Sequence, residues 1–158
     1  MSENPEIFIR PAANADCENV QNLVFSVLRE YNLTPEPNGT DADLSDIEAN
    51  YIKRGGLFEV LEDAEGNLLG TVGLFPLNAE TVELRKMYFA KNLRGRGFGK
   101  KTLERMIEKA RELGFKRIHL ETASVLKEAI GLYEKYGFQP TADGMHSERC
   151  DTAYFLEI

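Results

Sequence analysis

The sequence predicts an α/β fold with a mixed β-sheet, in one domain that spans residues 1–158 and is ordered from about residue 7. The 158 residues fit one domain, and 42% of them are hydrophobic, which is enough for a sizeable core. Hydrophobic residues repeat every three to four positions in some segments and every second position in others, which distinguishes helices from strands. The resulting order is βααβββαβαβ. The strands Thr81–Phe89 and Lys116–Glu121, joined by a helix, can be parallel neighbours.

The first half of the chain is expected to contain one strand and two helices. The strand is Ile7–Arg10, and the segment Asn32–Thr40 is a loop because it contains prolines and a glycine. A second short helix is expected over Ala42–Lys53, ended by the glycine pair Gly55–Gly56. The hydrophobic face of the first helix has helical spacing and consists of Val20, Leu23, Val24, Val27, Leu28 and Tyr31.

The second half is expected to contain most of the strands. Three follow one another, and a turn at Glu65–Asn67 joins the first two: Leu57–Glu62, Leu68–Pro76 and Thr81–Phe89. A long helix carries Leu103, Met106, Ile107, Ala110 and Leu113 on one face. Gly114 ends this helix, because glycine readily adopts the left-handed conformation of a helix C-terminus. The last three elements are the strand Lys116–Glu121, the helix Lys127–Tyr136 and the strand Asp151–Glu157.

A glycine-rich loop, Arg94–Lys100, lies between a predicted strand and the long helix. Glycine lets the backbone approach a ligand closely, and the first N–H groups of a helix lack internal partners. A strand, a glycine loop and a helix N-terminus together therefore form a phosphate-binding site. Two familiar motifs do not fit. A P-loop needs glycine where Arg94 stands, and neither glycine pair of a dinucleotide-binding fingerprint is completed, because Lys100 and Thr102 occupy the third position. The alternative to a phosphate site is a turn with solvated cations.

Two segments resemble the acetyl-CoA signature of the GNAT superfamily of N-acetyltransferases. The first is Leu84–Phe89 followed by the Arg94–Lys100 loop, which contains Arg-x-x-Gly-x-Gly. The second is Glu128–Phe138, which is similar to the family block Ala-Ile-x-Leu-Tyr-Glu-Lys-x-Gly-Phe. The two segments have the separation found in the family, and the predicted element order agrees from Ile7 to Ile158.

The resemblance implies the GNAT acyl-CoA N-acyltransferase fold, in which two central parallel strands, here Val82–Phe89 and Lys116–Glu121, split into a V. It also implies acetyl-CoA as the cosubstrate. The pantetheine would pair with the backbone of Met87, Tyr88 and Phe89. The pyrophosphate would lie on the amides of Arg94, Gly95, Arg96, Gly97, Phe98, Gly99 and Lys100.

The sequence independently indicates a β-bulge in the first of these strands. Val82 and Leu84 alternate in one phase, whereas Met87 and Phe89 alternate in the other. One extra residue near Arg85–Lys86 reconciles the two phases. An amide freed there can bind the cofactor or the thioester oxygen.

The resemblance assigns catalytic roles to Glu83 and Tyr133. An alkyl amine with a pKa near 10 is mostly protonated at neutral pH, so a base or a water relay is needed, and Glu83 matches the family position often used as the base. Tyr133 matches the tyrosine that protonates the leaving thiolate. The alternatives without a catalytic role are a solvent-facing strand carboxylate for Glu83 and a core aromatic side chain for Tyr133. The family often has asparagine where this chain has Leu126, which puts that cofactor contact in doubt, although Ser124 is a candidate replacement.

Candidate acceptor-binding residues are Arg29, Tyr31 and Arg85, since arginines suit a carboxylate-bearing amine. The expected reaction is acetyl transfer to a primary amine of a small molecule, such as an amino acid, by direct attack in a ternary complex. A polyamine, a protein lysine or N-terminus, and a non-catalytic acetyl-CoA sensor are alternatives. A nucleotide-binding protein is the weakest one. His119 and Glu121, on the other central strand, are expected to be packed or solvated, and the alternative is that either faces the cleft.

The amino-acid composition indicates which classes of partner and ligand are not expected. The net charge of −7 disfavours nucleic acid. No stretch approaches about 20 apolar residues and the acidic N-terminus is no signal peptide, so no membrane partner and a cytoplasmic location are expected. No cysteines or histidines have metal-ligand spacing, so no metal is expected, and Cys17 and Cys150 are expected to be free thiols. A homodimer is compatible with the family but not readable from the sequence.

Overall fold

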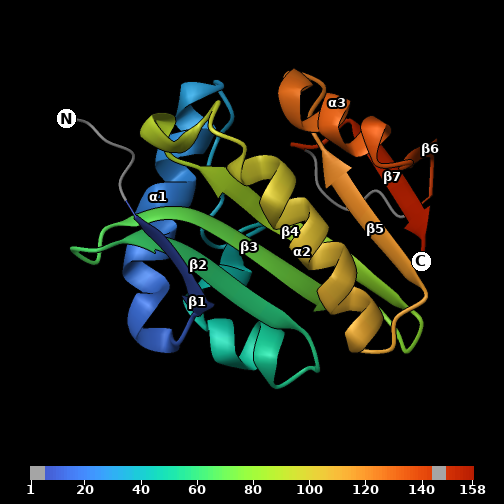
Figure 1. The fold of residues 1–158 in the computed structure, drawn as a ribbon, viewed down its shortest axis with the longest axis horizontal. Coiled ribbons are helices and arrows are strands. Elements are labelled where there is room, and N and C mark those ends of the chain that lie inside the picture. Colours follow the sequence, from blue (N-terminus) through green and yellow to red (C-terminus); the bar gives the residue numbers. More distant parts are fainter. Residues whose placement is uncertain (1–5, 144–148) are drawn as a thin grey trace.

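The computed structural model describes residues 6–143 and 149–158, and the strands in those ranges form one seven-stranded sheet (Figure 1). The strand order is β1-β2-β3-β4-β5-β7-β6. All neighbouring strands are antiparallel except β4 and β5, which are parallel. The strands are β1 (Ile7–Pro11), β2 (Leu57–Asp63), β3 (Leu68–Pro76), β4 (Thr81–Phe89), β5 (Arg117–Thr122), β6 (Gln139–Thr141) and β7 (Thr152–Glu157).

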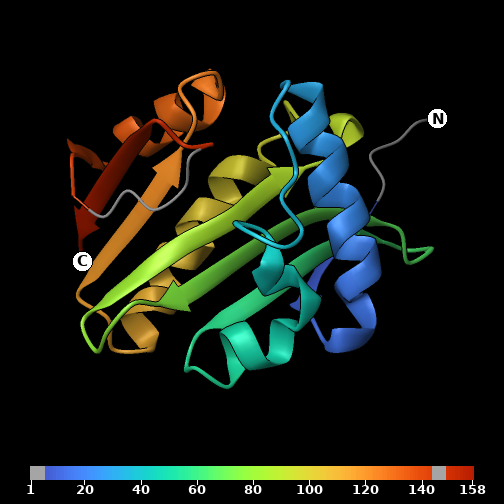
Figure 2. The same cartoon turned by 180° about the vertical axis from the view of Figure 1, so that it is seen from behind.

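Helices cover both faces of the sheet, so the sheet is the middle of three layers (Figures 1 and 2). One face is covered by α1 (Cys17–Glu30), and the other by α2 (Phe98–Glu112) and α3 (Lys127–Lys135). Short helical turns, η1 (Asn14–Asp16) and η4 (Lys91–Leu93), precede α1 and α2. Within the described ranges, no helix is long and apolar enough to cross a membrane.

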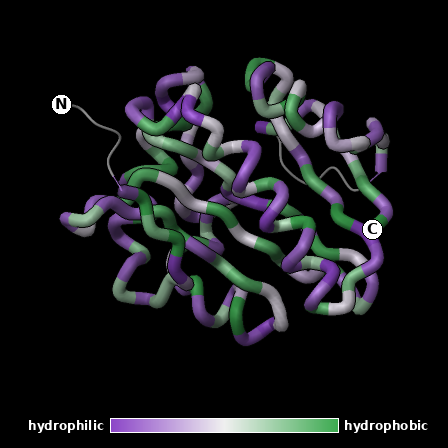
Figure 3. The backbone as a smooth tube through the Cα atoms, viewed as in Figure 1, coloured by the Kyte–Doolittle hydropathy of each residue, from purple (hydrophilic) through white to green (hydrophobic). Residues whose placement is uncertain are grey.

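The core forms because each helix buries one hydrophobic stripe against the sheet. In α2 the buried stripe includes Leu103, Met106 and Ala110, which pack with strand residues of β3, β4 and β5. Burying a side chain such as leucine contributes roughly 1.5–3 kcal/mol, so these stripes fix the helices on the sheet. The tube in Figure 3 shows the hydrophobic residues recurring along the strands and along one side of α2. Gly114, with φ +92°, ends α2 as predicted.

The predicted helix over 42–53 is wrong as a single helix. The chain instead forms a 3₁₀ turn, η2 (Ala42–Ser45), and a π-helical turn, η3 (Glu48–Ile52). Asp46 separates them with a non-helical backbone, φ −150° and ψ 82°. Its Oδ1 accepts hydrogen bonds from the Ala49 N–H at 3.0 Å and the Asn14 amide at 2.9 Å. The Asp46 side chain thus binds a backbone N–H in the second turn, and the non-helical backbone of Asp46 interrupts the helix between the two turns.

The sequence prediction also missed β6, a three-residue strand at the edge of the sheet. Its central residue, Pro140, lacks an N–H and weakens the strand signal. Edge strands tolerate proline because one side of the strand needs no hydrogen-bond donor. Pro140 is therefore compatible with β6, although it weakened the prediction of a strand there.

The predicted bulge in β4 is confirmed. The register pairs Gly73 with Arg85 and Thr71 with Tyr88, so Lys86 and Met87 lie together opposite Val72. Lys86 has φ +57°, and its carbonyl accepts a hydrogen bond from the Thr71 hydroxyl at 2.7 Å. The bulge keeps hydrophobic residues on one face: Val82, Leu84 and Met87 all join the core cluster that contains α2.

The predicted V-shaped split is also confirmed. Pairing between β4 and β5 covers only residues 81–83 and 117–119, which ends at the pair Glu83 and His119. Beyond that pair, the strands diverge, as Figures 1 and 2 both show. A bulge bends the strand that carries it, and the bulge at Lys86 lies just past the last pair. Among the residues that the structure describes, the split therefore leaves one edge of β4 without a strand partner beyond Glu83.

Candidate active site

A cavity of about 510 Å³ lies where β4 and β5 separate. Its walls come from α1, β4, the glycine-rich loop, the end of β5, the start of α3 and the residues just before β7. The volume is within the range of small-molecule and cofactor sites. The divergence of the two strands therefore creates a space large enough for a ligand at the centre of the sheet.

Most of the predicted ligand-binding residues lie in the wall of this cavity. Those that line it are Tyr31, Glu83, Arg85, Met87, Tyr88, Phe89, Arg94, Gly95, Gly99 and Tyr133. The predicted residues outside the lining are Arg29, Arg96, Gly97, Phe98 and Lys100. Arg29 is exposed near the end of α1, whereas the other four belong to the glycine-rich loop or the first turn of α2.

The glycine-rich loop brings the N-terminus of α2 to the cavity. Gly95 and Gly97 have φ +76° and +84°, in the left-handed region that disfavours other residues. Gly97 directly precedes α2, and Gly99 in its first turn lines the cavity. Arg94 fixes the loop, because its Nε donates to the Phe89 carbonyl at 2.9 Å and its guanidinium pairs with Glu30. The unpaired first amides of α2 are consequently held beside the space.

The carboxylate of Glu83 is buried and held by two cationic side chains. Only 4% of Glu83 is exposed. One oxygen accepts a hydrogen bond from Arg85 Nε, and the other lies 3.1 Å from His119 Nδ1. Burial alone would raise the pKa of Glu83, but the hydrogen bond with His119 and the charge of Arg85 outweigh burial and lower it below 4.5. Glu83 is therefore ionised, with both oxygens engaged.

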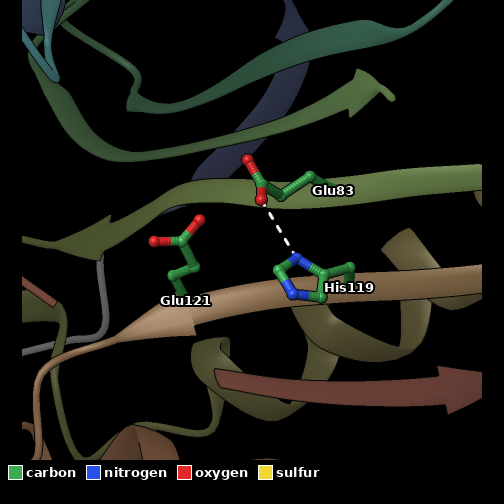
Figure 4. Close-up of side chains that lie close together, drawn as sticks. All are labelled: Glu83, His119 and Glu121. Carbon is green, nitrogen blue, oxygen red and sulfur yellow. Dashed lines mark hydrogen bonds and ion pairs between the residues drawn. The ribbon is translucent and has the colours of Figure 1, made fainter. Parts of the chain in front are cut away.

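Glu121 completes a cluster with Glu83 and His119 (Figure 4). Glu83 projects from β4, and the other two side chains project from β5 toward it. One ligand-type atom of each residue lies within 4.8 Å of the others, a spacing that a metal ion can use. Both oxygens of Glu83 and both ring nitrogens of His119 already have protein partners, so a metal ion would first have to break those contacts.

Tyr133 presents its ring to the core and its hydroxyl to the cavity. The residue is buried, packs on Phe138 with ring centroids 5.6 Å apart, and also lines the cavity. Burial, with smaller contributions from Tyr88 and Cys150, raises the pKa of the Tyr133 hydroxyl well above 10. No hydrogen bond joins this hydroxyl to another residue in ranges 6–143 and 149–158. It is thus protonated and available to a ligand.

The structure shows whether Ser124 can replace the family asparagine, whose position before α3 is occupied by Leu126. Leu126 and Lys127 line the cavity, whereas Ser124 does not. Both the N–H and the hydroxyl of Ser124 donate to the Asp151 carboxylate at 2.7 Å. Ser124 is therefore committed to holding the segment before β7 and does not stand in for the family asparagine. Cys17 and Cys150 form no disulfide in ranges 6–143 and 149–158, as predicted.

Sequence reasoning missed a buried ionic cluster next to the bulge. Asp41, which is 1% exposed, accepts two hydrogen bonds from Arg149 at 2.8 and 2.9 Å and lies 3.2 Å from Lys86 Nζ. Lys86 also lies 3.3 Å from Asp43. The expectation for His119, a packed or a solvated side chain, was likewise incomplete: the structure buries His119, and its contact with Glu83 was not predicted. The i, i+2 spacing of His119 and Glu121 was the one available signal, since it places both on one face of a strand.

Comparison with known proteins agrees with this geometry. Residues 24–138 match the model of the acetyltransferase (GNAT) family. The uncharacterized N-acetyltransferase YjgM of Escherichia coli (strain K12) is 41% identical over 125 residues, which cover 76% of this chain and 74% of the relative.

Solved structures share the fold over nearly the whole chain. A GNAT-family acetyltransferase from Staphylococcus aureus Mu50 has a TM-score of 0.90 at 26% identity, covering 96% of this chain and 99% of that chain. YncA from Salmonella typhimurium, in complex with acetyl-CoA, has a TM-score of 0.73 at 26% identity and covers 96% and 94%. With the split strands, the bulge and the glycine-rich loop in place, the chain belongs to the GNAT family of acetyltransferases.

Proposed function

We propose that this chain transfers the acetyl group of acetyl-CoA to a primary amine of a small molecule, by direct attack of the amine in a ternary complex. One observation carries the proposal: a single cavity is lined by Glu83, by Tyr133 and by the glycine-rich loop. A proton acceptor, a proton donor and a phosphate-binding helix N-terminus thus share one space.

The residues around the cavity fit acetyl-CoA. The edge of β4 at Met87–Phe89 has no β5 partner, so its backbone groups are available to the amides of a pantetheine chain. The first amides of α2 suit a pyrophosphate. When bound, acetyl-CoA would supply an activated thioester, and the protein would hold it between β4 and β5. No metal ion is needed for this chemistry.

In the proposed reaction, Glu83 accepts a proton from the acceptor ammonium, directly or through water. The neutral nitrogen then attacks the acetyl carbon. Tyr133 donates its hydroxyl proton to the sulfur that leaves, because this hydroxyl is protonated and faces the cavity. In each turnover Glu83 gains one proton and Tyr133 loses one. The enzyme returns to its starting state when Glu83 releases its proton to solvent and Tyr133 takes one up.

The charges of the cavity favour an acceptor that is itself zwitterionic. Glu83 and Glu121 offer carboxylates to an ammonium, whereas Arg85 offers a guanidinium to a carboxylate. Arg85 is held 3.7 Å above the Phe75 ring, which orients it. An amino acid or a close analogue carries both charges. A polyamine carries cations alone and lacks the carboxylate that Arg85 in the same wall would bind.

The first test measures thiol release from acetyl-CoA with amino acids, polyamines, aminoglycosides and short peptides, and binding of acetyl-CoA by calorimetry. Release with amino acids supports the proposal. Release with peptides alone would instead make the protein a protein-directed acetyltransferase. Binding without release by any acceptor would identify an acetyl-CoA sensor, and absence of binding would overturn the proposal entirely.

A further inference from the structure

His119 lies behind Glu83 and outside the lining of the cavity. The two residues form the last pair before β4 and β5 separate. His119 is 7% exposed, and Glu83 lines the cavity whereas His119 does not. An acceptor in the cavity can therefore contact Glu83, whereas His119 lies beyond the residues that form the cavity wall.

Both ring nitrogens of His119 face hydrogen-bond acceptors. Nδ1 lies 3.1 Å from Glu83 Oε2, and Nε2 lies 3.1 Å from the Asp143 carbonyl oxygen. A neutral imidazole carries one N–H, so it satisfies one of these acceptors, whereas the imidazolium satisfies both. In agreement, the hydrogen bond with Glu83 raises the pKa of His119 above 6.5 and outweighs the opposing effect of burial.

The protonation state of His119 therefore controls the basicity of Glu83. When His119 is charged, Glu83 is neutralised twice, by the imidazolium and by Arg85, and is a weak base. When His119 is neutral with its proton on Nε2, the Nδ1 lone pair faces the Glu83 oxygen. Two acceptors at that distance repel each other, so the pair gains affinity for one proton.

We propose that His119 is a positioning residue that stores the proton which Glu83 removes from the acceptor ammonium. The inference rests on the proposed function. The proton leaves the ammonium nitrogen for Glu83, and the same proton or its equivalent moves from Glu83 Oε2 to His119 Nδ1. The result is a neutral amine, an ionised Glu83 and an imidazolium hydrogen-bonded to Asp143. The carboxylate thus faces the substrate, and the histidine behind it holds the charge.

Within ranges 6–143 and 149–158, the charged groups around His119 can be named. They are Glu83 and Arg85 on β4, Glu121 and Arg117 on β5, and Asp143 after β6. Its register partner on β7 is the uncharged Phe155. Arg117 is paired with Glu157 at the surface, so its replacement removes a nearby charge without touching the cavity.

The test compares kcat/KM of wild type and His119→Gln from pH 5.5 to 9, with Arg117→Gln as the matched control. The ratio of two profiles cancels the ionisation of the acceptor, which is common to both. We expect wild type to exceed His119→Gln by about 10–100-fold at high pH and the ratio to fall toward 1 below the pKa of His119. The Arg117→Gln ratio should stay flat. A flat ratio for His119→Gln would overturn the proposal.

A second readout works without turnover and covers a poorly folded variant. NMR titration of the histidine ring protons should show a pKa above 6.5 for His119, whose signals are identified by their loss in His119→Gln. In Glu83→Gln this pKa should fall toward 6.5. An unchanged pKa would overturn the coupling even in an active enzyme. If the coupling holds while no acceptor is acetylated, the proposed function fails and the proton-storing role fails with it.

Discussion

At the scale of single residues, the two proposed catalytic groups are prepared in opposite ways. The carboxylate of Glu83 has both oxygens engaged by Arg85 and His119, which fixes its direction and lowers its pKa. The ring of Tyr133 is fixed by packing on Phe138, and its hydroxyl faces the cavity. A buried hydroxyl directed into a ligand site, with burial keeping its proton in place, is suited to donate that proton.

Replacing Tyr133 by phenylalanine should therefore lower kcat by about 10–1,000-fold and leave the Kd for acetyl-CoA nearly unchanged, because only the hydroxyl is removed. Steady-state kinetics and calorimetry measure the two quantities. Tyr136→Phe is the matched control, since the Tyr136 hydroxyl donates to Glu104 outside the cavity. Equal turnover of Tyr133→Phe and wild type would remove Tyr133 from the mechanism.

At the scale of elements, the site depends on segments whose backbone is set by particular contacts. Gly97 introduces α2 with φ +84°, and a Cβ built there meets no atom within 4 Å. Substitution at Gly97 is thus penalised by conformation alone and not by collision. Gly131, inside α3, also has open space around a built Cβ but has no positive φ. Substitutions at the two glycines therefore differ in backbone strain and not in steric crowding.

Gly97→Ala should lower the free energy of unfolding by about 1 kcal/mol and weaken acetyl-CoA binding, since alanine disfavours the left-handed conformation. Gly131→Ala should instead raise the free energy of unfolding by about 0.5–1 kcal/mol, because alanine is the better helix former. Urea unfolding of the two variants measures both effects. The same sign of change in both would contradict the role given to φ.

The ionic cluster of Asp41, Arg149 and Lys86 ties the loop before η2 to the bulge of β4 and to the segment before β7. All three side chains are at least nine-tenths buried. Removing one partner from a buried ion pair leaves the other charge uncompensated, which typically costs about 3–5 kcal/mol. Asp41→Ala should lower the free energy of unfolding by that amount, whereas breaking the exposed pair with Arg117→Gln should cost at most about 1 kcal/mol.

The same cluster predicts a pH dependence of stability. Burial would raise the pKa of Asp41, but the hydrogen bond with Arg149 and the charge of Lys86 outweigh burial and lower it from 3.8 to about 2. At about 1.4 kcal/mol per pKa unit, Asp41 stabilises the fold by about 2 kcal/mol. Because the folded-state pKa is the lower one, this contribution is present above pH 4 and is lost as the pH falls toward 2. The stability difference between wild type and Asp41→Asn should shrink by about 2 kcal/mol over that range.

At the scale of the whole molecule, the cavity lies between a half that contains β1–β4 with α1 and a half that contains β5–β7 with α3. Only three residue pairs of β4 and β5 join the two halves of the sheet directly. The core cluster around α2 spans both sides, because it includes residues of β3, β4, β5 and β7. A ligand that contacts both sides of the split would add a link where the sheet itself is weakest.

Acetyl-CoA should accordingly raise the melting temperature of the protein. At a concentration of 100 times Kd, a ligand that binds the folded state alone stabilises it by about 2.7 kcal/mol, or roughly 5–10 °C for a chain of this size. Differential scanning fluorimetry measures the shift. ATP at the same concentration is the control, because the chain has neither a P-loop nor a dinucleotide-binding fingerprint. An equal shift of the melting temperature with ATP would contradict a pantetheine site.

Features that depend on neighbouring residues could be predicted from the amino-acid sequence. The periodicity of hydrophobic residues predicted most of the strands and helices, and the change of phase between Leu84 and Met87 predicted the bulge. The glycines of residues 94–100 predicted the loop before α2. Each signal acts through neighbours a few residues away, where the geometry of a strand or helix fixes the relation between side chains.

Features that depend on contacts between residues far apart in the chain could not be predicted and are seen only in the folded protein. Asp46 divides the predicted helix at residues 42–53 because it binds Asn14, 32 residues earlier. The pairing of Asp41 with Arg149, 108 residues apart, and of Glu83 with His119, 36 residues apart, follows from strand register and packing. Hydrophobic periodicity tells which face a residue occupies but not which partner lies opposite. The charges that set the pKa of Glu83 therefore become visible only when β4 and β5 lie side by side.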